Sequence, residues 1–135
     1  MDETVAAIKA ALTAAGVTNY YVDAPSSRTY PYALVWSSAG RPDIEPALVE
    51  SSAFSDDLGV TVVAASPEGV LSVGERVRAA LAPFDGGSGV VAGRITYLHH
   101  YDSRPVQVDR DVTITATNRH PAYGVDMYRL VSTPA

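Results

Sequence analysis

The adjacent histidines His99 and His100 are the first residues in the sequence that could bind a metal ion. They lie in the stretch VVAGRITYLHHYD, which is typical of a strand. Successive side chains of a strand point to opposite faces, so the two imidazoles cannot easily bind one ion. His120 is distant in sequence and the chain has no cysteine. We therefore expect one inward and one solvated imidazole, and neither a metal nor a cofactor site.

Ser88 lies among glycines in the stretch DGGSGV, where a serine nucleophile could be considered. The stretch lacks the G-x-S-x-G spacing and the strand-to-helix turn that present such a nucleophile. It is not a phosphate-binding loop either, because it lacks the Lys-Ser/Thr ending and precedes an expected strand instead of a helix. We interpret DGGSG as a flexible connection.

Carboxylates are plentiful, but none of them has the surroundings of a catalytic acid or base. A catalytic pair needs one carboxyl group whose pKa is raised in an apolar pocket, and acids in a polar loop have no such pocket. We therefore expect solvated charge and predict that the protein is not an enzyme. The residues in question are Asp43, Glu45, Glu50, Asp56, Asp57, Asp102, Asp109 and Asp111.

The eight tyrosines allow two interpretations. Scattered over strands, they are ordinary sheet residues; gathered on one surface, they would form an assembly face, since Tyr and Arg are enriched at protein interfaces.

Length and charge limit the possible classes of protein. The chain has 135 residues, of which 47% are hydrophobic, and this suits one globular domain, residues 1–135. A formal charge of −5 with no basic cluster argues against sequence-independent nucleic-acid binding. The first residues lack the basic segment of a secretory signal, and no apolar stretch has transmembrane length. We expect a soluble protein made in a cytoplasm, with no membrane partner.

Two helices are expected. The first begins at Asp2, carries apolar residues at spacings of three and four, and stops at Gly16. The second has Ser66 as N-cap, Pro67 at its first position and an end at Pro83. Its core-facing stripe is Val70, Val73, Val77 and Leu81. Gly69 and Gly74 lower the helix propensity, which indicates close backbone packing.

The remaining apolar stretches predict strands at 19–25, 30–37, 58–66, 90–102, 104–118 and 124–132. In 104–118, Val106, Val108, Val112 and Ile114 share a parity, with polar residues between them. The fold class is therefore α+β, with a mixed or antiparallel sheet of about five to six strands, two helices packed on it, and a long polar arm. The arm is residues 37–58, which are acidic and contain two prolines, and a connection of this length is usually functional or disordered.

The order of these elements resembles the tail terminator proteins, or minor tail proteins, of long-tailed bacteriophages, and those of actinobacterial phages in particular. The similar stretches are ETVAAIKAAL, YALVWSS with the acidic arm after it, LGVTVVAASPEGVLSVGERVRAAL, and RPVQVDRDVTITATNRHPAYGVDMYRLVS. They cover almost the whole chain, but none is a chemical signature.

The resemblance implies a structural protein of the virion tail, assembled in the host cytoplasm. Such proteins form a ring, usually a hexamer, that caps the head-proximal end of the tail tube, stops tube polymerisation and offers the head a docking surface. The implied partners are other copies of the chain, the major tail tube protein and a head-completion or connector protein. DNA would pass through the acidic ring without specific binding.

In this interpretation the arm reaches a neighbouring subunit or the last ring of the tube and becomes ordered only on assembly. This ordering costs about 2 to 5 kcal/mol of the interaction free energy. We expect the assembly interface to include charged and aromatic residues of the arm and two arginines of the second helix. These are Arg41, Asp43, Glu45, Glu50, Phe54, Asp56, Asp57, Arg76 and Arg78.

Two other functions remain open at this point. A neck or head-completion protein would also form a ring but bind the portal side. A small ligand-binding or enzymatic α+β domain could use the arm as a lid, and it would need a deep apolar pocket below it.

Overall fold

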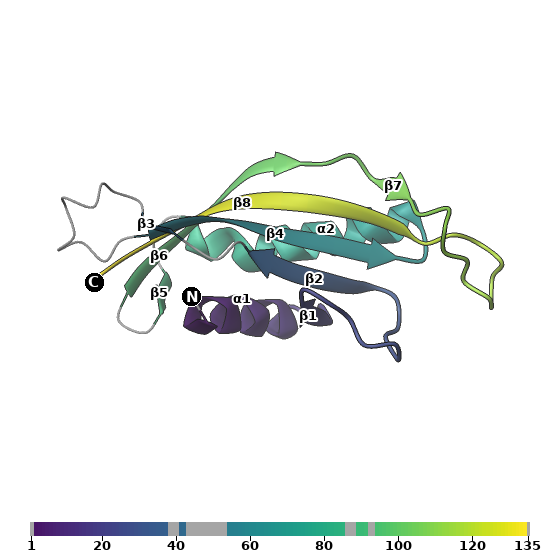
Figure 1. Cartoon of the computed structure of the whole chain (residues 1–135), viewed down its shortest axis with the longest axis horizontal. Coiled ribbons are helices and arrows are strands. Elements are labelled where there is room, and N and C mark those ends of the chain that lie inside the picture. Colours follow the sequence, from purple (N-terminus) through teal and green to yellow (C-terminus); the bar gives the residue numbers. More distant parts are fainter. Residues whose placement is uncertain (1, 38–40, 43–53, 86–88, 92–93, 135) are drawn as a thin grey trace.

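The computed structural model describes residues 2–37, 41–42, 54–85, 89–91 and 94–134. Two α-helices and eight strands follow the order in Figure 1. Their bounds are α1 Asp2–Ala14, β1 Asn19–Tyr21, β2 Tyr32–Ser37, β3 Arg41–Pro42, β4 Phe54–Ala64, α2 Pro67–Leu81, β5 Gly89–Val91, β6 Arg94–Ser103, β7 Gln107–Val108 and β8 Ala122–Pro134. A short 3₁₀ helix, Ala82–Phe84, follows α2.

The strands form one mixed sheet in the order β1-β2-β4-β8-β6-β5. β1 and β2 are parallel and every other described pair is antiparallel. β3 pairs with the start of β4, and β7 pairs with the start of β8. The predicted α+β class, with two helices and six principal strands, is confirmed.

Both helices lie against one face of the sheet and contact each other (Figure 1). Alternate residues of the central strands point toward them, as the period of two along a strand requires. The core on this face is one hydrophobic cluster that includes the predicted stripe of α2. Its largest fully buried side chains are Ile8, Leu12, Val35, Leu58, Val60, Val77, Leu81, Leu98 and Leu130.

Two of the predicted helix ends, the end of α1 and the start of α2, are confirmed in their hydrogen bonds. After α1, Gly16 has a φ of 79°, and Val17 N–H donates to the Leu12 carbonyl at 2.9 Å. A residue in the left-handed conformation commonly ends a helix, and glycine adopts this conformation without steric cost. At α2, the Gly69 N–H donates to the Ser66 hydroxyl oxygen at 3.1 Å, and Pro67 follows the cap. Ser66 and Pro67 therefore fix the start of α2.

The two glycines of α2 differ, and the prediction for one of them is wrong. A Cβ on Gly69 would lie 3.0 Å from the Ala64 Cβ, so close packing explains this glycine. A Cβ on Gly74 would meet nothing within 4 Å. Packing inside the molecule therefore does not require Gly74.

We expect Gly74→Ala to raise the free energy of unfolding by about 0.5 to 1 kcal/mol, because alanine is the better residue in a helix interior and space is available. Gly69→Ala is the matched control on the same helix, and the tight contact with Ala64 should cancel its gain. Urea unfolding of both variants measures the difference. Equal changes in the two would contradict this assignment.

Three strand predictions are wrong. The strand expected at 58 begins at Phe54, so Phe54–Leu58 belongs to the sheet instead of the arm, as does Arg41–Pro42. The acids of FSDDL disfavour a strand locally, but β8 supplies backbone partners from Phe54 onward.

The long strand expected at 90–102 is two antiparallel strands, β5 and β6, paired through Val91 and Arg94. In 104–118 only Gln107–Val108 is a strand. Residues that favour turns interrupt the strand there, in spite of the alternating pattern. Asp111 N–H donates to the Asp109 side chain, Asn118 has a positive φ, and Val112 is exposed.

Candidate functional site

The residues predicted for the assembly interface do not form one cluster in the described structure. Asp43, Glu45 and Glu50 lie outside the described residues. Arg41 pairs with Ser55, while Phe54 and Asp56 lie in β4 opposite Ser132 and Leu130 of β8. Asp57 also lies in β4, and Arg76 and Arg78 are on α2.

Asp57 is part of a surface cluster on the face of the sheet opposite the helices. It stands opposite Arg129 in the β4–β8 register, with 3.5 Å between its Oδ1 and the Arg129 Nη1. The Tyr101 hydroxyl donates to the same oxygen at 3.3 Å. Slight desolvation, followed by the nearby carboxylate, raises the pKa of Tyr101. Both members of the ion pair are about half exposed, so the pair contributes little to stability.

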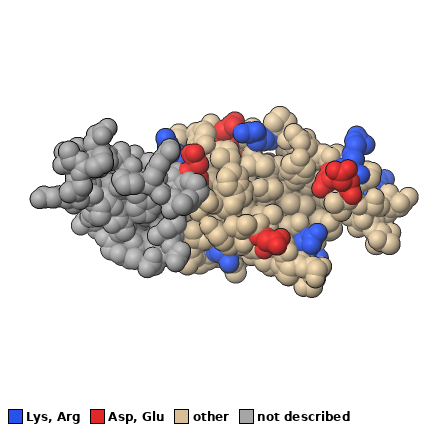
Figure 2. Space-filling view, viewed as in Figure 1, with Lys and Arg blue, Asp and Glu red and all other residues tan. Residues whose placement is uncertain are grey.

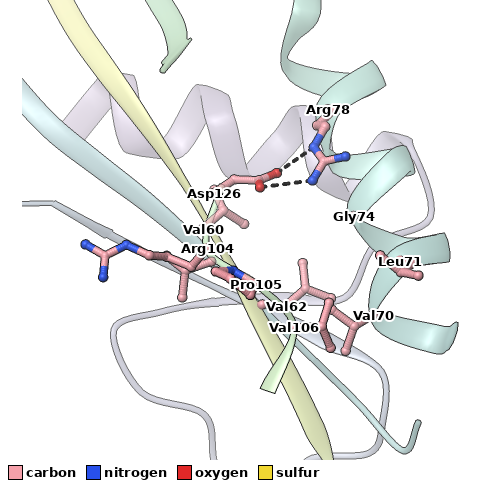
Figure 3. Close-up of a pocket in the computed structure, with 12 residues that line it drawn as sticks. Val60, Val62, Val70, Leu71, Gly74, Arg78, Arg104, Pro105, Val106 and Asp126 are labelled. Atoms are coloured by element: carbon pink, nitrogen blue, oxygen red, sulfur yellow. Dashed lines mark hydrogen bonds and ion pairs between the residues drawn. The ribbon is translucent and has the colours of Figure 1, made fainter. Parts of the chain in front are cut away.

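Arg78 binds a buried carboxylate on the opposite face. Its Nε and Nη2 donate to Oδ2 and Oδ1 of Asp126 at 3.0 and 3.1 Å (Figure 3). Asp126 is only 7% exposed, and the Ser103 hydroxyl also donates to its Oδ1, at 2.7 Å. Hydrogen bonding to Asp126 raises the pKa of Arg78, against a smaller opposing effect of burial. Arg78, which was predicted for the assembly interface, thus ties α2 to β8 within the chain.

His100 lies beside Ser103 and Asp126, and these residues together with Arg78 form what we call the polar cluster. The hydrogen bonds of His100 define which of its ring nitrogens carries a proton. His100 Nε2 lies 3.0 Å from the Asp102 carbonyl oxygen and 2.8 Å from Ser103 Oγ. A carbonyl only accepts, and Ser103 already donates to Asp126, so His100 Nε2 must be the donor to both. A serine nucleophile needs the reverse arrangement, in which histidine accepts the serine proton. The cluster therefore lacks the polarity of a Ser-His-Asp site.

Tyr128 completes the cluster with its ring against His100, at 5.1 Å between ring centroids. The residue is 2% exposed, and its hydroxyl has no hydrogen-bond partner within the described part of the chain. Burial, followed by the charge of Asp126, raises the pKa of Tyr128 above its ordinary value. A buried hydroxyl without a partner contributes nothing to offset its own desolvation.

Tyr128→Phe is expected to remove part of the loss of stability at high pH. A tyrosine in the unfolded chain loses its proton near pH 10, whereas the raised pKa keeps Tyr128 protonated in the folded state. The folded state then binds more protons, so the free energy of unfolding falls as pH rises above about 10. Phenylalanine at 128 should flatten this fall and leave stability at pH 7 equal or slightly higher.

Urea unfolding between pH 7 and 11 measures the effect, with Tyr97→Phe as the control at an exposed tyrosine. An unchanged alkaline slope in Tyr128→Phe would disprove the assignment.

A second feature is the sheet face that bears no helix in the described structure. Its residues align in rows across β2, β4 and β8: Tyr32, Val63 and Tyr123; Leu34, Thr61 and Val125; Trp36, Gly59 and Met127. We call these nine residues, together with Tyr97 of β6, the open face. Most are neither fully buried nor fully exposed, and Tyr97 is 41% exposed.

Charged side chains are sparse over the middle of the described surface in Figure 2 and lie mainly near its rim. Figure 2 shows the molecule in the same orientation as Figure 1, with its longest axis horizontal. By its residues, the open face is a largely apolar surface of half-exposed aromatic and aliphatic rows, with the Asp57–Arg129 ion pair on the same side of the sheet. Such surfaces mark sites of protein interaction.

Hollows in the described structure are small. One lies between α2 and the segment that joins β6 to β7, and another lies at the end of the open face near Tyr30 and Val112. Each measures about 180 Å³. Pockets for drug-sized ligands measure about 300 to 1,000 Å³, so neither has the size of such a site. Within the described residues, no group of three or more His, Asp or Glu side chains is placed to hold a metal ion.

The chain matches no model of a known protein family, and the search of curated proteins found no significant match. No helix within the described residues is both long and apolar enough to cross a membrane.

Sequence reasoning missed Asp126 and Tyr128, although a signal for both was present. In AYGVDMYRL, Asp126 and Tyr128 share the parity of Ala122 and Leu130, which are buried. An acid on the apolar parity of a strand must be paired or exposed. The sequence contains this conflict, but it does not identify Arg78 as the partner.

Proposed function

We propose that the protein is a structural protein of a long-tailed phage virion, a tail terminator that assembles as a ring on the head-proximal end of the tail tube. The observation that carries the proposal is the open face, an apolar surface of Trp, Tyr, Leu, Val and Met that no described helix covers. Burial of such a face against neighbouring protein chains supplies a driving force for assembly. The resemblance of the sequence to tail terminator proteins supplies the particular assembly.

The edges of the sheet support contact through a face. The outermost strands, β1 and β5, have three residues each, and short edge strands limit pairing between sheets of different molecules. The partners in this proposal are other copies of the chain, the tail tube protein and a head-completion or connector protein. Its location is the tail of the virion.

The buried polar cluster favours a structural function over an enzymatic one. Ser103 and His100 have the wrong hydrogen-bond polarity for nucleophilic catalysis, and Asp126 is held by a bidentate arginine. The hydrogen bonds described for Asp126 all join it to side chains of its own chain. The cluster therefore serves to fix α2 on the sheet.

Electron microscopy of the parent phage, with this gene interrupted by a stop codon, tests the proposal. Abnormally long tails without heads are expected, because nothing would end tube growth or complete the surface that the head binds. Tails of normal length without heads would instead indicate a neck protein. Intact infectious particles would refute a virion function.

A second variant tests the open face itself. Tyr97→Asp places a charge on this face at an exposed position, so the fold should tolerate it. We expect loss of complete virions with an unchanged circular dichroism spectrum. Ser72→Asp, at an exposed position of α2, is the control and should assemble normally. Normal assembly of Tyr97→Asp would exclude this face from the interface.

A further inference from the structure

Val22, which follows β1, has a backbone conformation that is unusual for its side chain. Its φ is 67°, in the left-handed region, and around it the Asp23 N–H donates to the Tyr21 carbonyl at 2.7 Å. A hydrogen bond between residues i and i+2 around a positive φ forms the rare, strained kind of γ-turn. Valine is branched at Cβ and fits this region poorly, whereas Asn118, the other non-glycine residue of positive φ in the described structure, is of a type that tolerates it. The sequence therefore retains valine where glycine would cost less.

Packing within the subunit does not account for this valine. Its side chain is 56% exposed, and backbone hydrogen bonds hold the turn, including one from the Val22 N–H to the Val35 carbonyl at 2.9 Å. Glycine can make the same bonds. Strained backbone persists where the surrounding structure imposes it, and it clusters at functional sites. What valine adds over glycine is an apolar side chain next to Tyr21, which is also exposed.

Exposed apolar side chains gather at two opposite edges of the sheet. Tyr21 and Val22 lie at the β1 edge, and β6 and β7 follow each other along the side of β8 away from β4. Figure 1 shows β1 and β7 on opposite sides of the molecule. Among the described residues, the other exposed large hydrophobic side chains are Leu71 on α2 and four in β6, β7 and the turn that follows, namely Tyr97, Tyr101, Val108 and Val112. Each subunit therefore has two different edges with exposed apolar side chains.

We propose that the β1 edge of one subunit packs against the β6–β7 edge of a second copy of the chain, with Val22 in the contact. The two edges cannot meet within one subunit, because β2, β4 and β8 lie between them. A second copy is the partner indicated, because every copy exposes both sets of apolar side chains. Different patches that meet between identical copies form a heterologous contact, which closes into a ring when the rotation between copies allows it. Side chains make this contact, since β1 has only three residues and the γ-turn already uses the Tyr21 carbonyl.

Val22→Gly separates the contact from the fold. Glycine relieves the strain of the positive φ, so the midpoint of urea unfolding should rise. It also removes the apolar side chain, so self-association of the full chain, measured by analytical ultracentrifugation, should weaken at least about tenfold. Asn118→Gly is the control at a second position of positive φ and should leave association unchanged. Unchanged association of Val22→Gly, or a wild-type chain that stays monomeric up to about 1 mM, would overturn the inference.

A mixing experiment tests whether two different edges meet. Val22→Asp places a charge on the β1 edge, at a φ that aspartate tolerates better than valine, and Val108→Asp places one on the β6–β7 edge. Each variant alone should fail to associate. In an equal mixture one intact edge of each variant remains, so a dimer with one chain of each kind should form, and its absence would overturn the inference. Leu71→Asp, at the exposed leucine of α2, is the control and should associate as the wild type does.

The contact depends on the proposed assembly into a ring, but the two can fail separately. A dimer in the mixture together with normal virions from the phage with the stop codon would support the contact and refute the tail function. Wild-type association of each single variant would exclude these edges and leave the tail function in place.

Discussion

Arg78→Ala is expected to lower the free energy of unfolding by about 2 to 3 kcal/mol. Asp126 is 7% exposed and would keep only the Ser103 hydroxyl and the nearby His100 as partners. Loss of one partner from a fully buried pair costs about 3 to 5 kcal/mol, because the other charge stays buried. The Arg78 side chain is 47% exposed, so water already screens part of the pair and the expected cost is smaller.

Arg76→Ala is the matched control, since Arg76 is an exposed arginine of the same helix that does not contact Asp126 in any described bond. Urea unfolding at pH 7 should show a change within about 0.5 kcal/mol for this variant. Asp126→Ala should cost less than Arg78→Ala, because the freed arginine can extend into water and a buried carboxylate cannot. Equal effects of Arg76→Ala and Arg78→Ala would show that the pair does not stabilise the fold.

The local rules predicted α2 almost completely. Its cap, its first proline and its apolar stripe are all signals within the 16 residues from Ser66 to Leu81, and no distant partner is needed to interpret them. The central strands were predicted for a similar reason, because runs of β-branched and aromatic residues favour strands. Local patterns therefore determine which segments fold into elements.

Features that depend on distant partners could not be predicted in this way. The strand β4 extends to Phe54 because β8 pairs with it along its whole length, and no pattern in FSDDL shows that partner. Asp126 is buried because Arg78, 48 residues earlier, lies on the adjacent helix. Charged residues suggest a loop or a surface when they are considered one at a time, and only the tertiary fold pairs them.

The open face was missed for a third reason. In GVTVVA and YALVW both parities are apolar, so the sequence does not show which face the helices cover. The parity of Val60 and Val62 faces the helices and the parity of Thr61 and Val63 does not. A strand that is apolar on both faces in a sheet covered on one side leaves an apolar surface, and this combination required the structure.

Gly59→Ala is expected to lower the free energy of unfolding by about 2 kcal/mol, through overpacking against Trp36. An added Cβ would overlap Cε2 and Cζ2 of the indole, which is impossible without movement. Trp36 crosses β4 at Gly59, and its Nε1 donates to the Thr61 hydroxyl at 3.1 Å. The indole must move outward, break this hydrogen bond and expose more apolar surface.

The chain contains one tryptophan, so its fluorescence reports this movement without interference. We expect a red-shifted emission maximum in Gly59→Ala, together with a lower midpoint of urea unfolding. In a Trp36→Ala background the same glycine substitution should cost almost nothing, and this double-mutant cycle assigns the effect to the pair. An unshifted emission maximum would contradict the contact. Trp36 and Gly59 both belong to the open face, so in the proposed assembly Gly59→Ala should weaken association beyond its effect on stability.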